Sequence, residues 1–238
     1  MKFIADFHVH TVASGHAYNT IYEYALEAKK KGLKYIAMTD HGPAMAGGAH
    51  LYHFQNLRCL PEKINGVRVL KGVEANIMDR EGRLDLKDED LAALDVVIAS
   101  FHQHLGYDGS DKDANTRAVI NVIRNHNVKI LGHPGNPQFP MDKNAVVEEC
   151  KKQGVFIEIN NSSFSGVIRQ GSYEHCVEFA RLVKRAGWKV VFGSDSHCLD
   201  TLGRFDKCVQ IAKEAGLSAD DVVNTSAKMV EKYIIANP

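Results

Sequence analysis

The sequence lacks a surplus of charge of either sign. Its 29 Lys and Arg residues are balanced by 29 Asp and Glu residues, so the formal net charge is zero. The strong basic field that attracts nucleic acid is therefore missing, and few clustered arginines or aromatic side chains could form a track for a polynucleotide. We expect no nucleic-acid partner.

Long apolar runs and paired cysteines are also lacking. The N-terminal segment reaches the carboxylate of Asp6 before a signal-peptide core can form, and no later run approaches the roughly 18 apolar residues of a membrane span. The five cysteines are an odd number and include no Cys-x-x-Cys pair, which argues against a disulfide framework and for free thiols. We therefore expect a cytoplasmic protein without a membrane partner.

No segment of the chain separates it into parts. The 238 residues are 45% hydrophobic and 24% charged, which is ordinary globular composition, and no linker rich in Pro, Ser or Gly interrupts them. One α/β barrel fills about 250 residues as a single unit. We expect one domain that spans residues 1–238.

Hydrophobic runs of strand length alternate with amphipathic segments of helix length, a pattern typical of βα units around a parallel sheet. Seven strands are expected, at residues 2–10, 35–41, 67–77, 95–102, 129–134, 155–161 and 189–197. The first helix is expected to begin with a capping box at Thr20 and Glu23 and to end at Gly32. No glycine-rich phosphate turn follows the first strand, so a distorted, TIM-like (β/α)7 barrel is favoured over an open doubly wound sheet.

The chain is rich in histidine, with 12 residues, and their positions are informative. Alternate residues of a strand share a face, so His8 and His10 should point into the barrel lumen together with Asp6. Imidazoles and a carboxylate are costly there unless they are satisfied, and a metal ion is the simplest partner. The last predicted strand repeats this arrangement with Asp195 and His197.

Other predicted strands end in the same residue types, at the rim where barrel enzymes place their active sites. Counted together, the candidate metal ligands are His8, His10, His16, His41, Glu74, His102, His133, Asp195 and His197. Nine ligands are too many for one tetrahedral ion, so two or three ions are expected, with Glu74 as a candidate bridge. Imidazole and carboxylate ligands suit zinc, manganese or iron.

These motifs resemble the PHP superfamily, which is named for polymerase and histidinol phosphatase domains. The resemblance rests on Asp6-x-His8-x-His10, Thr39-Asp40-His41, Glu74, His102, Gly132-His133-Pro134 and Ser194-Asp195-Ser196-His197. With the segment 158–164, the chain looks most like the YcdX-type phosphatase branch. The resemblance covers essentially the whole chain and implies a distorted (β/α)7 barrel with a trinuclear site, usually zinc.

The resemblance also implies how the ligands are divided among three ions. The first ion would be held by His8, His10, Glu74 and Asp195, the second by His16, His41 and His197, and the third by Glu74, His102 and His133. Such a site suits a metal-dependent phosphatase that cleaves a small phosphomonoester with a hydroxide bridging two ions. Asp195 or His197 is the candidate proton donor to the leaving group.

Several residues outside the ligand set are candidates for contact with substrate or ligands. Arg169 follows the sixth strand and could bind a phosphate in bidentate fashion. His53, at the end of the irregular segment that begins at Gly42, and His104, two residues past a ligand, could also touch substrate. Asp6 and Asp40 are expected to orient ligand imidazoles.

Alternatives from other classes stay open. The chain could be a catalytically silent metal-binding domain used for regulation or metal buffering, although an intact ligand set argues against this. It could also be a phosphodiesterase or exonuclease, on the basis of the resemblance. An amidohydrolase barrel would be expected to have eight units and often a bridging lysine, neither of which is found. Assembly into a homo-oligomer is open as well.

Overall fold

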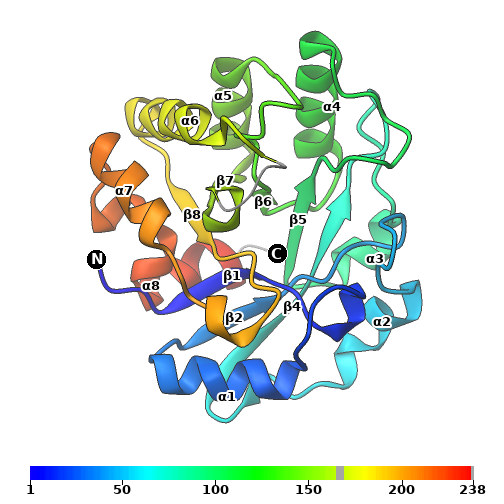
Figure 1. The fold of residues 1–238 in the computed structure, drawn as a ribbon, viewed down its shortest axis with the longest axis vertical. Helices are drawn as coiled ribbons and strands as arrows, with labels where there is room; N and C mark the ends of the chain where they lie inside the picture. The colour runs from blue at the N-terminus through cyan, green and yellow to red at the C-terminus, as the bar shows by residue number, and fades with distance from the viewer. Residues whose placement is uncertain (165–168, 237–238) are drawn as a thin grey trace.

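The computed structural model, which describes residues 1–164 and 169–236, is a nearly closed barrel of parallel strands surrounded by helices (Figure 1). The strands are β1 (Ala5–Val9), β2 (Tyr35–Met38), β3 (Lys63–Ile64), β4 (Val67–Asn76), β5 (Val96–Ser100), β6 (Ile130–Leu131), β7 (Phe156–Asn160) and β8 (Val190–Gly193). Seven of them pair in parallel in the order β1-β2-β4-β5-β6-β7-β8, which confirms the predicted (β/α)7 architecture. β3 was not predicted, since it is a two-residue strand that pairs antiparallel with β4.

Helices connect successive parallel strands and cover the outside of the barrel (Figure 1). They are α1 (Ile21–Lys31), α2 (Leu51–Asn56), α3 (Asp88–Ala92), α4 (Lys112–Asn125), α5 (Lys143–Gln153), α6 (Ser172–Ala186), α7 (Asp206–Glu214) and α8 (Ala227–Val230). The expected capping box begins α1: Thr20 Oγ1 accepts from the Glu23 amide, and the Glu23 carboxylate accepts from the Thr20 amide. In the described residues, no helix has the length and apolar character needed to cross a membrane.

The side chains that face the lumen form an apolar layer below a polar one. Ile98 and Phe156 are fully buried and pack in one cluster with Val230 of the C-terminal helix α8. Two residues further along the same strands, Ser100 and Glu158 point into the same lumen, because strand residues two apart share a face. The polar layer therefore lies above the apolar layer, at the C-terminal end of the strands.

Asn224 connects β1 and β8, the two ends of the strand order. Just beyond the C-terminal ends of β1 and β8, the chain segments that follow them meet directly, since the amide of His10 donates to the carbonyl of Ser196 at 2.9 Å. Further back, Asn224 lies between the two strands: its Oδ1 accepts from the Phe192 amide at 2.8 Å, and its Nδ2 donates to the carbonyls of Ala5 (3.0 Å) and Phe192 (2.8 Å). The side-chain amide of Asn224 thus joins β1 and β8 where, within the described residues, the two strands do not hydrogen-bond to each other directly.

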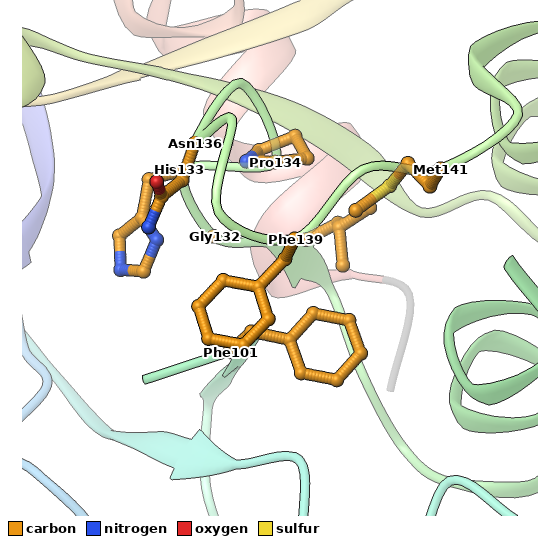
Figure 2. Close-up of a pocket in the computed structure, with 8 residues that line it drawn as sticks. Phe101, Gly132, His133, Pro134, Asn136, Phe139 and Met141 are labelled. Carbon is orange, nitrogen blue, oxygen red and sulfur yellow. The ribbon is translucent and has the colours of Figure 1, made fainter. Parts of the chain in front are cut away.

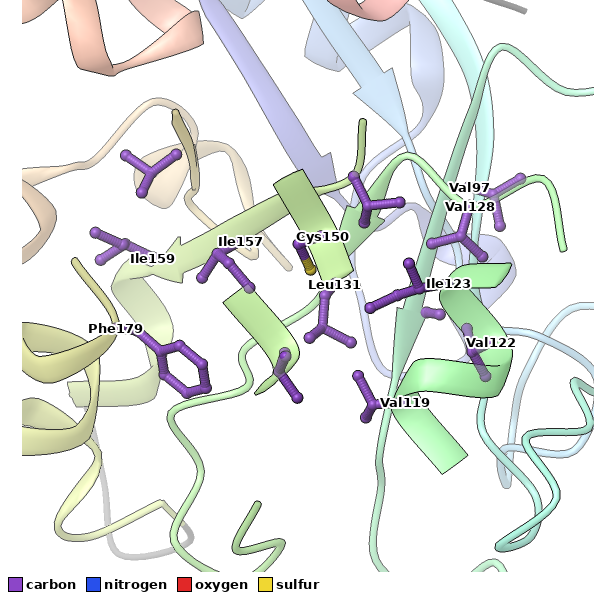
Figure 3. Close-up of a cluster of buried hydrophobic side chains, with 14 of the residues drawn as sticks. Val97, Val119, Val122, Ile123, Val128, Leu131, Cys150, Ile157, Ile159 and Phe179 are labelled. Atoms are coloured by element: carbon purple, nitrogen blue, oxygen red, sulfur yellow. The ribbon is translucent and has the colours of Figure 1, made fainter. Parts of the chain in front are cut away.

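The outer core lies between the sheet and its helices, as Figure 3 shows for β5 to β7. Val97 and Ile157 point outward from their strands, opposite to the lumen-facing residues beside them. They meet Val119 of α4 and Phe179 of α6, and Cys150 of α5 fills the space between. The free thiol of Cys150 behaves as a small apolar side chain there, and burial raises the pKa of this thiol.

The strands end earlier than predicted. β6 has only two residues, and β8 ends at Gly193, so Asp195 and His197 follow the strand instead of belonging to it. His102 and His133 also lie in loops just beyond their strands. These residues converge because the loops leave one rim of the barrel, and strand periodicity accounts for the orientation of His8 and Glu74 alone.

Candidate metal centre

Glu74, on the lumen face of β4, lies at the centre of a cluster of imidazoles. It is 1% exposed, and its Oε1 accepts a hydrogen bond from Ser100 Oγ at 2.7 Å. Five imidazole nitrogens lie within 3.5 Å of its carboxylate oxygens: His41 Nδ1 (2.8 Å), His133 Nε2 (2.8 Å), His8 Nε2 (3.3 Å), His102 Nε2 (3.3 Å) and His10 Nε2 (3.5 Å). One carboxylate therefore faces five imidazoles from four separate segments of the barrel, as a bridging ligand would.

Asp195 forms a second carboxylate centre beside the first. Its Oδ1 lies 3.1 Å from His10 Nε2 and 3.7 Å from His8 Nε2. Its Oδ2 points the other way and accepts from Arg169 Nη1 at 3.3 Å and Asn160 Nδ2 at 3.2 Å. Asp195 therefore connects the buried imidazoles with the more open side of the site.

His16 and His197 lie at the solvent side of the cluster. Their Nε2 atoms are 3.0 Å apart, and the ring of His197 lies 4.4 Å from that of His10. His16 is exposed, the His197 side chain is 28% exposed, and His8 and His10 are fully buried. The structure thus brings all nine predicted ligands into one cluster. We call its buried end, formed by His8, His10 and Glu74, the floor, and its solvent-exposed end, formed by His16 and His197, the mouth.

The buried nitrogens of this cluster lack partners that protein groups could supply. His8 Nε2, His10 Nε2, His41 Nδ1 and His102 Nε2 are buried and make no hydrogen bond of acceptable geometry within the described residues. Orphaned buried polar atoms are rare, and four of them aimed at one carboxylate call for a missing partner. Divalent zinc, manganese or iron fits, because each accepts imidazole nitrogen and carboxylate oxygen as ligands.

Three overlapping triads have ligand atoms within 4.8 Å of one another, a spacing that one ion can span. They are His8, His10 and Glu74; His41, Glu74 and His102; and His10, His41 and His197. Glu74 belongs to two triads, as do His10 and His41. The cluster is therefore multinuclear in its geometry, with more than one way to share His10 and His41.

The two carboxylates of the centre stay ionised. Burial alone would raise the pKa of Glu74, but the surrounding imidazoles, His8 and His102 foremost, hold it well below its usual range. Burial also opposes ionisation of Asp195, and His8 together with Arg169 outweighs it and keeps the Asp195 pKa well below normal. Both side chains are thus in the form that ligates a metal ion.

The imidazoles of His8, on β1, and His10, just after it, behave in opposite ways. Burial, reinforced by His41, lowers the pKa of His10 to about 3, so this ring is neutral at physiological pH. For His8 burial acts in the same direction, but the neighbouring Glu158 and Glu74 outweigh it and raise the pKa of His8 well above its ordinary value. In the metal-free chain His8 thus carries a proton, which it would release on binding a metal.

Glu158 is the residue of this site that sequence analysis missed. Its Oε1 lies 2.7 Å from His8 Nδ1, and its Oε2 accepts from the backbone amide of His133 at 2.7 Å. The carboxylate thereby fixes which nitrogen of His8 faces the centre and anchors the loop that carries His133. The available signal was a glutamate on the lumen face of a predicted strand. A glycine makes room for it, since a Cβ at Gly193 would collide with Glu158 Oε1.

Two further imidazoles are oriented by polar neighbours. His102 Nδ1 lies 2.7 Å from Asn76 Oδ1, two residues past Glu74 on β4. His10 Nδ1 lies 3.2 Å from Ser14 Oγ, which in turn donates to Asp40 Oδ1 at 2.7 Å. Asp40 thus acts on a ligand imidazole as expected, though through Ser14.

The loop that carries His133 packs against an aromatic pair (Figure 2). The rings of Phe101 and Phe139 stack with centroids 4.9 Å apart, and together with Met141 they line a small pocket beside His133. Phe101 immediately precedes the candidate ligand His102, so one aromatic cluster supports both loops that carry candidate ligands.

His133 (φ 28°) and Asp195 (φ 54°) both have positive φ, which is strained backbone for residues other than glycine.

The other residues predicted for the site differ in how they relate to it. Arg169 reaches the centre through Asp195, and its guanidinium also donates to Ser163 Oγ at 3.2 Å. His53 Nε2 lies 3.2 Å from Asp40 Oδ2, behind the ligand cluster. His104 is exposed, and within the described residues no hydrogen bond, ion pair or ring contact joins it to the cluster.

For His104 and Asp6, the structure differs from what the sequence predicted. His104 was grouped with His102 on the assumption that the strand continues, but β5 ends at Ser100 and the backbone of His104 has φ 64°. Asp6 was expected to orient an imidazole and instead accepts from the backbone amides of Ser194 (3.1 Å) and Gly203 (2.8 Å). It ties the segment after β8 to β1.

Comparison with known proteins agrees with this geometry. The family model of the PHP domain matches residues 6–162. A probable phosphatase of Thermoanaerobacter sp. (strain X514) is 51% identical over 98% of this chain and 95% of its own length. A probable phosphatase of Shewanella frigidimarina is 44% identical over 99% of this chain and 94% of its own length.

A solved structure shares the fold. The histidinol phosphate phosphatase of Lactococcus lactis, in complex with zinc, L-histidinol and phosphate, matches 90% of this chain and 94% of its own with a TM-score of 0.65. At 22% sequence identity, this likeness supports the barrel architecture alone.

Proposed function

The chain belongs to the PHP-domain family of metal-dependent hydrolases, in a branch whose curated members are named probable phosphatases, and on this premise we propose that it hydrolyses small phosphomonoesters at a trinuclear metal centre. The observation that carries the proposal is the set of orphaned imidazole nitrogens around Glu74. Zinc is the metal we propose, with manganese or iron as substitutes, and the whole barrel, residues 1–238, serves as one catalytic domain.

We assign the nine candidate ligands to three ions. The first ion would be held by His8, His10, Glu74 and Asp195, the second by His16, His41 and His197, and the third by Glu74, His102 and His133. Contacts within each set support this division, among them the 3.1 Å between His10 Nε2 and Asp195 Oδ1 and the 3.0 Å between the Nε2 atoms of His16 and His197. His10 and His41 also stand close enough to serve a neighbouring ion.

Bound metal ions supply neutralising charge for a phosphoryl group and make water a nucleophile near neutral pH. The chain's own residues bind and orient the substrate. Arg169 can donate to a phosphoryl oxygen from its position next to Asp195, where its side chain is 19% exposed. A guanidinium suits this task because its donors match the spacing of phosphate oxygens.

Asp195 is the proposed proton carrier. Its Oδ2 faces away from the buried imidazoles toward Arg169, on the more open side of the site. As water attacks phosphorus and the ester P–O bond breaks, Asp195 can accept the water proton and return it to the leaving oxygen. His197 is suited to ligation instead, since its Nδ1 donates to the Asp195 carbonyl at 2.9 Å and leaves Nε2 free of a proton.

The test combines metal analysis with turnover of p-nitrophenyl phosphate. The purified protein should contain two to three equivalents of transition metal and release phosphate, and His8→Ala, His102→Ala and His197→Ala should each lose activity. His175→Ala, on α6 outside the cluster, is the matched control and should retain both metal and activity. A protein that binds the metal and hydrolyses no phosphate ester would contradict the proposal, as would one that binds less than one equivalent.

A further inference from the structure

A groove opens directly beside the metal centre, on the side of β7 and β8. Its volume is about 430 Å³, within the usual range of about 300–1,000 Å³ for small-molecule sites. Asp195 and His197 form its inner wall, and the outer wall comes from η3 (Asn161–Phe164) and from the chain between Cys198 and Lys207. A group attached to the reacting phosphate can therefore extend from the centre into this groove.

Two cations line the outer wall of the groove and are largely unused by the protein. Arg204 has one ion-pair contact, from Nε to Asp206 Oδ1 at 3.8 Å, and both side chains are more than half exposed. Lys207 Nζ makes no hydrogen bond or ion pair within the described residues. Two carboxylates also line the groove: Asp206 on the outer wall, and Asp195 on the inner wall, where the proposed centre assigns it to a metal ion. On the outer wall the cations therefore outnumber the carboxylate by two to one.

The backbone that presents these cations is firmly held. Phe205, between Arg204 and Asp206, is 3% exposed and packs edge-on against Phe3 with ring centroids 5.0 Å apart. The amide of Lys207, in the first turn of α7, donates to Asn161 Oδ1 at 3.0 Å. The two cationic side chains therefore extend from fixed positions on either side of a buried anchor, which limits the entropy that a ligand must overcome.

We propose that this groove binds the leaving-group part of the substrate, and that Arg204 and Lys207 select phosphomonoesters whose leaving alcohol carries a second anionic group. A phosphate or a carboxylate is the chemistry that this pair of donors recognises. The inference rests on the proposed phosphatase function and adds to it a substrate class. Neutral alcohols gain nothing from the two cations, and alcohols that carry an ammonium group are repelled.

The experiment compares four phosphomonoesters on the metal-loaded protein: fructose bisphosphate, phosphoglycerate, glycerol phosphate and phosphoethanolamine. We expect kcat/KM for the first two to exceed that for glycerol phosphate by about tenfold, because charge-assisted contacts strengthen binding and the solvent exposure of Arg204 and Lys207 limits the gain. Phosphoethanolamine should be the poorest substrate. The ratio between fructose bisphosphate and phosphoglycerate distinguishes a phosphate from a carboxylate as the preferred second anion.

The double variant Arg204→Gln/Lys207→Gln should remove the preference, so that the ratio of kcat/KM between phosphoglycerate and glycerol phosphate falls about tenfold, mainly through KM. Lys213→Gln, a charge change at the far end of the same helix and outside the groove, should leave the ratio unchanged. A double variant that keeps the wild-type ratio would overturn the inference, and so would a wild-type protein without any preference.

These failures differ from failure of the proposed function. If p-nitrophenyl phosphate is hydrolysed but the four esters are not discriminated, the phosphatase function stands and the substrate class is wrong. If no phosphate ester at all is hydrolysed by the metal-loaded protein, the function and the inference that rests on it fall together.

Discussion

The floor and the mouth of the metal centre differ in how the protein holds their ligands. The floor, formed by His8, His10 and Glu74, is at most 1% exposed, and the mouth, formed by His16 and His197, is open to solvent. Each floor ligand has a polar partner: Glu158 for His8, Ser14 for His10 and Ser100 for Glu74. At the mouth, His197 Nδ1 donates to the carbonyl of Asp195 two residues away, and its Nε2 faces His16 on the exposed side of the site.

On the proposed assignment, this difference predicts that the ions of the centre are held with unequal strength. Ligands that are already oriented lose little freedom on binding, and their partners are worth roughly 10–100-fold in metal affinity. The floor should therefore bind first and release last, and the mouth should exchange its ion most readily. The mouth also borders the groove, so the most labile ion would be the one nearest the leaving group.

The largest effect is expected from Glu74→Gln, which removes the carboxylate shared by the floor. A neutral amide cannot balance the charge of two ions, so bound metal should decrease and kcat should fall by about 1,000-fold, the equivalent of losing a Lewis acid worth several kcal/mol. Metal analysis and phosphate release measure this. Glu148→Gln, an exposed change on α5, is the matched control, and full metal content in Glu74→Gln would show that Glu74 is no bridge.

Two buried imidazoles of the cluster, His10 and His133, should dominate the pH dependence of the metal-free protein. Burial lowers the pKa of His10 to about 3 and of His133 to about 4, from the 6.5 that each has in the unfolded chain. Between pH 6.5 and about 4 the unfolded chain binds more protons than the folded one, so stability falls as pH falls, by about 1.4 kcal/mol per pH unit for each imidazole. His8, whose pKa is raised, is protonated in both states below pH 6.5 and adds nothing in this window.

Thermal unfolding of chelator-treated protein at pH 7 and pH 5 measures this effect. The melting temperature should be lower at pH 5. An unchanged or higher melting temperature at pH 5 would mean that His10 and His133 are protonated in the folded state, and they would then not be the neutral ligands proposed here.

Glu158→Gln should weaken the floor without touching any ligand. The amide cannot accept from His8 Nδ1 as strongly as the carboxylate, so affinity for the floor ion should fall by roughly 10–100-fold. Competition with a chelator of known affinity measures the change, and the ion at the mouth serves as the internal control. Equal weakening of every ion would show that Glu158 supports the fold instead of His8.

His16→Ala should remove metal from the mouth alone. We expect the loss of one equivalent and a fall in kcat of about 100-fold, smaller than for Glu74→Gln because the floor ions stay in place. Metal analysis after gel filtration tests this. Loss of all bound metal would contradict the separation into floor and mouth.

Thr20→Ala should have the smallest effect, since it loosens the start of α1 next to the mouth. Loss of the capping box should lower the free energy of unfolding by about 1 kcal/mol, as measured by urea denaturation. Metal content should not change. A loss of the mouth ion in this variant would show that the helix start, and not only His16, positions the mouth.

The sequence was sufficient to predict the barrel and the rim on which the ligands meet. Seven hydrophobic runs marked the parallel strands, and the capping box of α1 lies where Thr20 and Glu23 predicted it. The role of Asn224 was not predictable, because a side chain that bridges β1 and β8 leaves no periodic signal. β3 was missed because two residues are too few for a pattern.

For the site, residue types were predictable and pairings were not. All nine candidate ligands meet in one cluster, whereas the contact of Glu158 with His8 joins residues 150 positions apart and needs coordinates to be seen. The assumption that His104 shares a strand face with His102 was wrong, because β5 ends at Ser100 and the loop beyond it has its own geometry; contact of His104 with substrate stays a prediction. Strand periodicity predicts which way a side chain points within a strand. Beyond the end of the strand, the conformation of the loop determines the direction.

The most direct test of the account is reconstitution of the metal-free protein with zinc, one equivalent at a time, while the rate of phosphate release from p-nitrophenyl phosphate is followed. We predict little activity after the first equivalent, a rise as the floor fills, and a plateau at the third equivalent when the mouth is occupied. A plateau after a single equivalent, or phosphate release that does not depend on added metal, would contradict a trinuclear phosphatase.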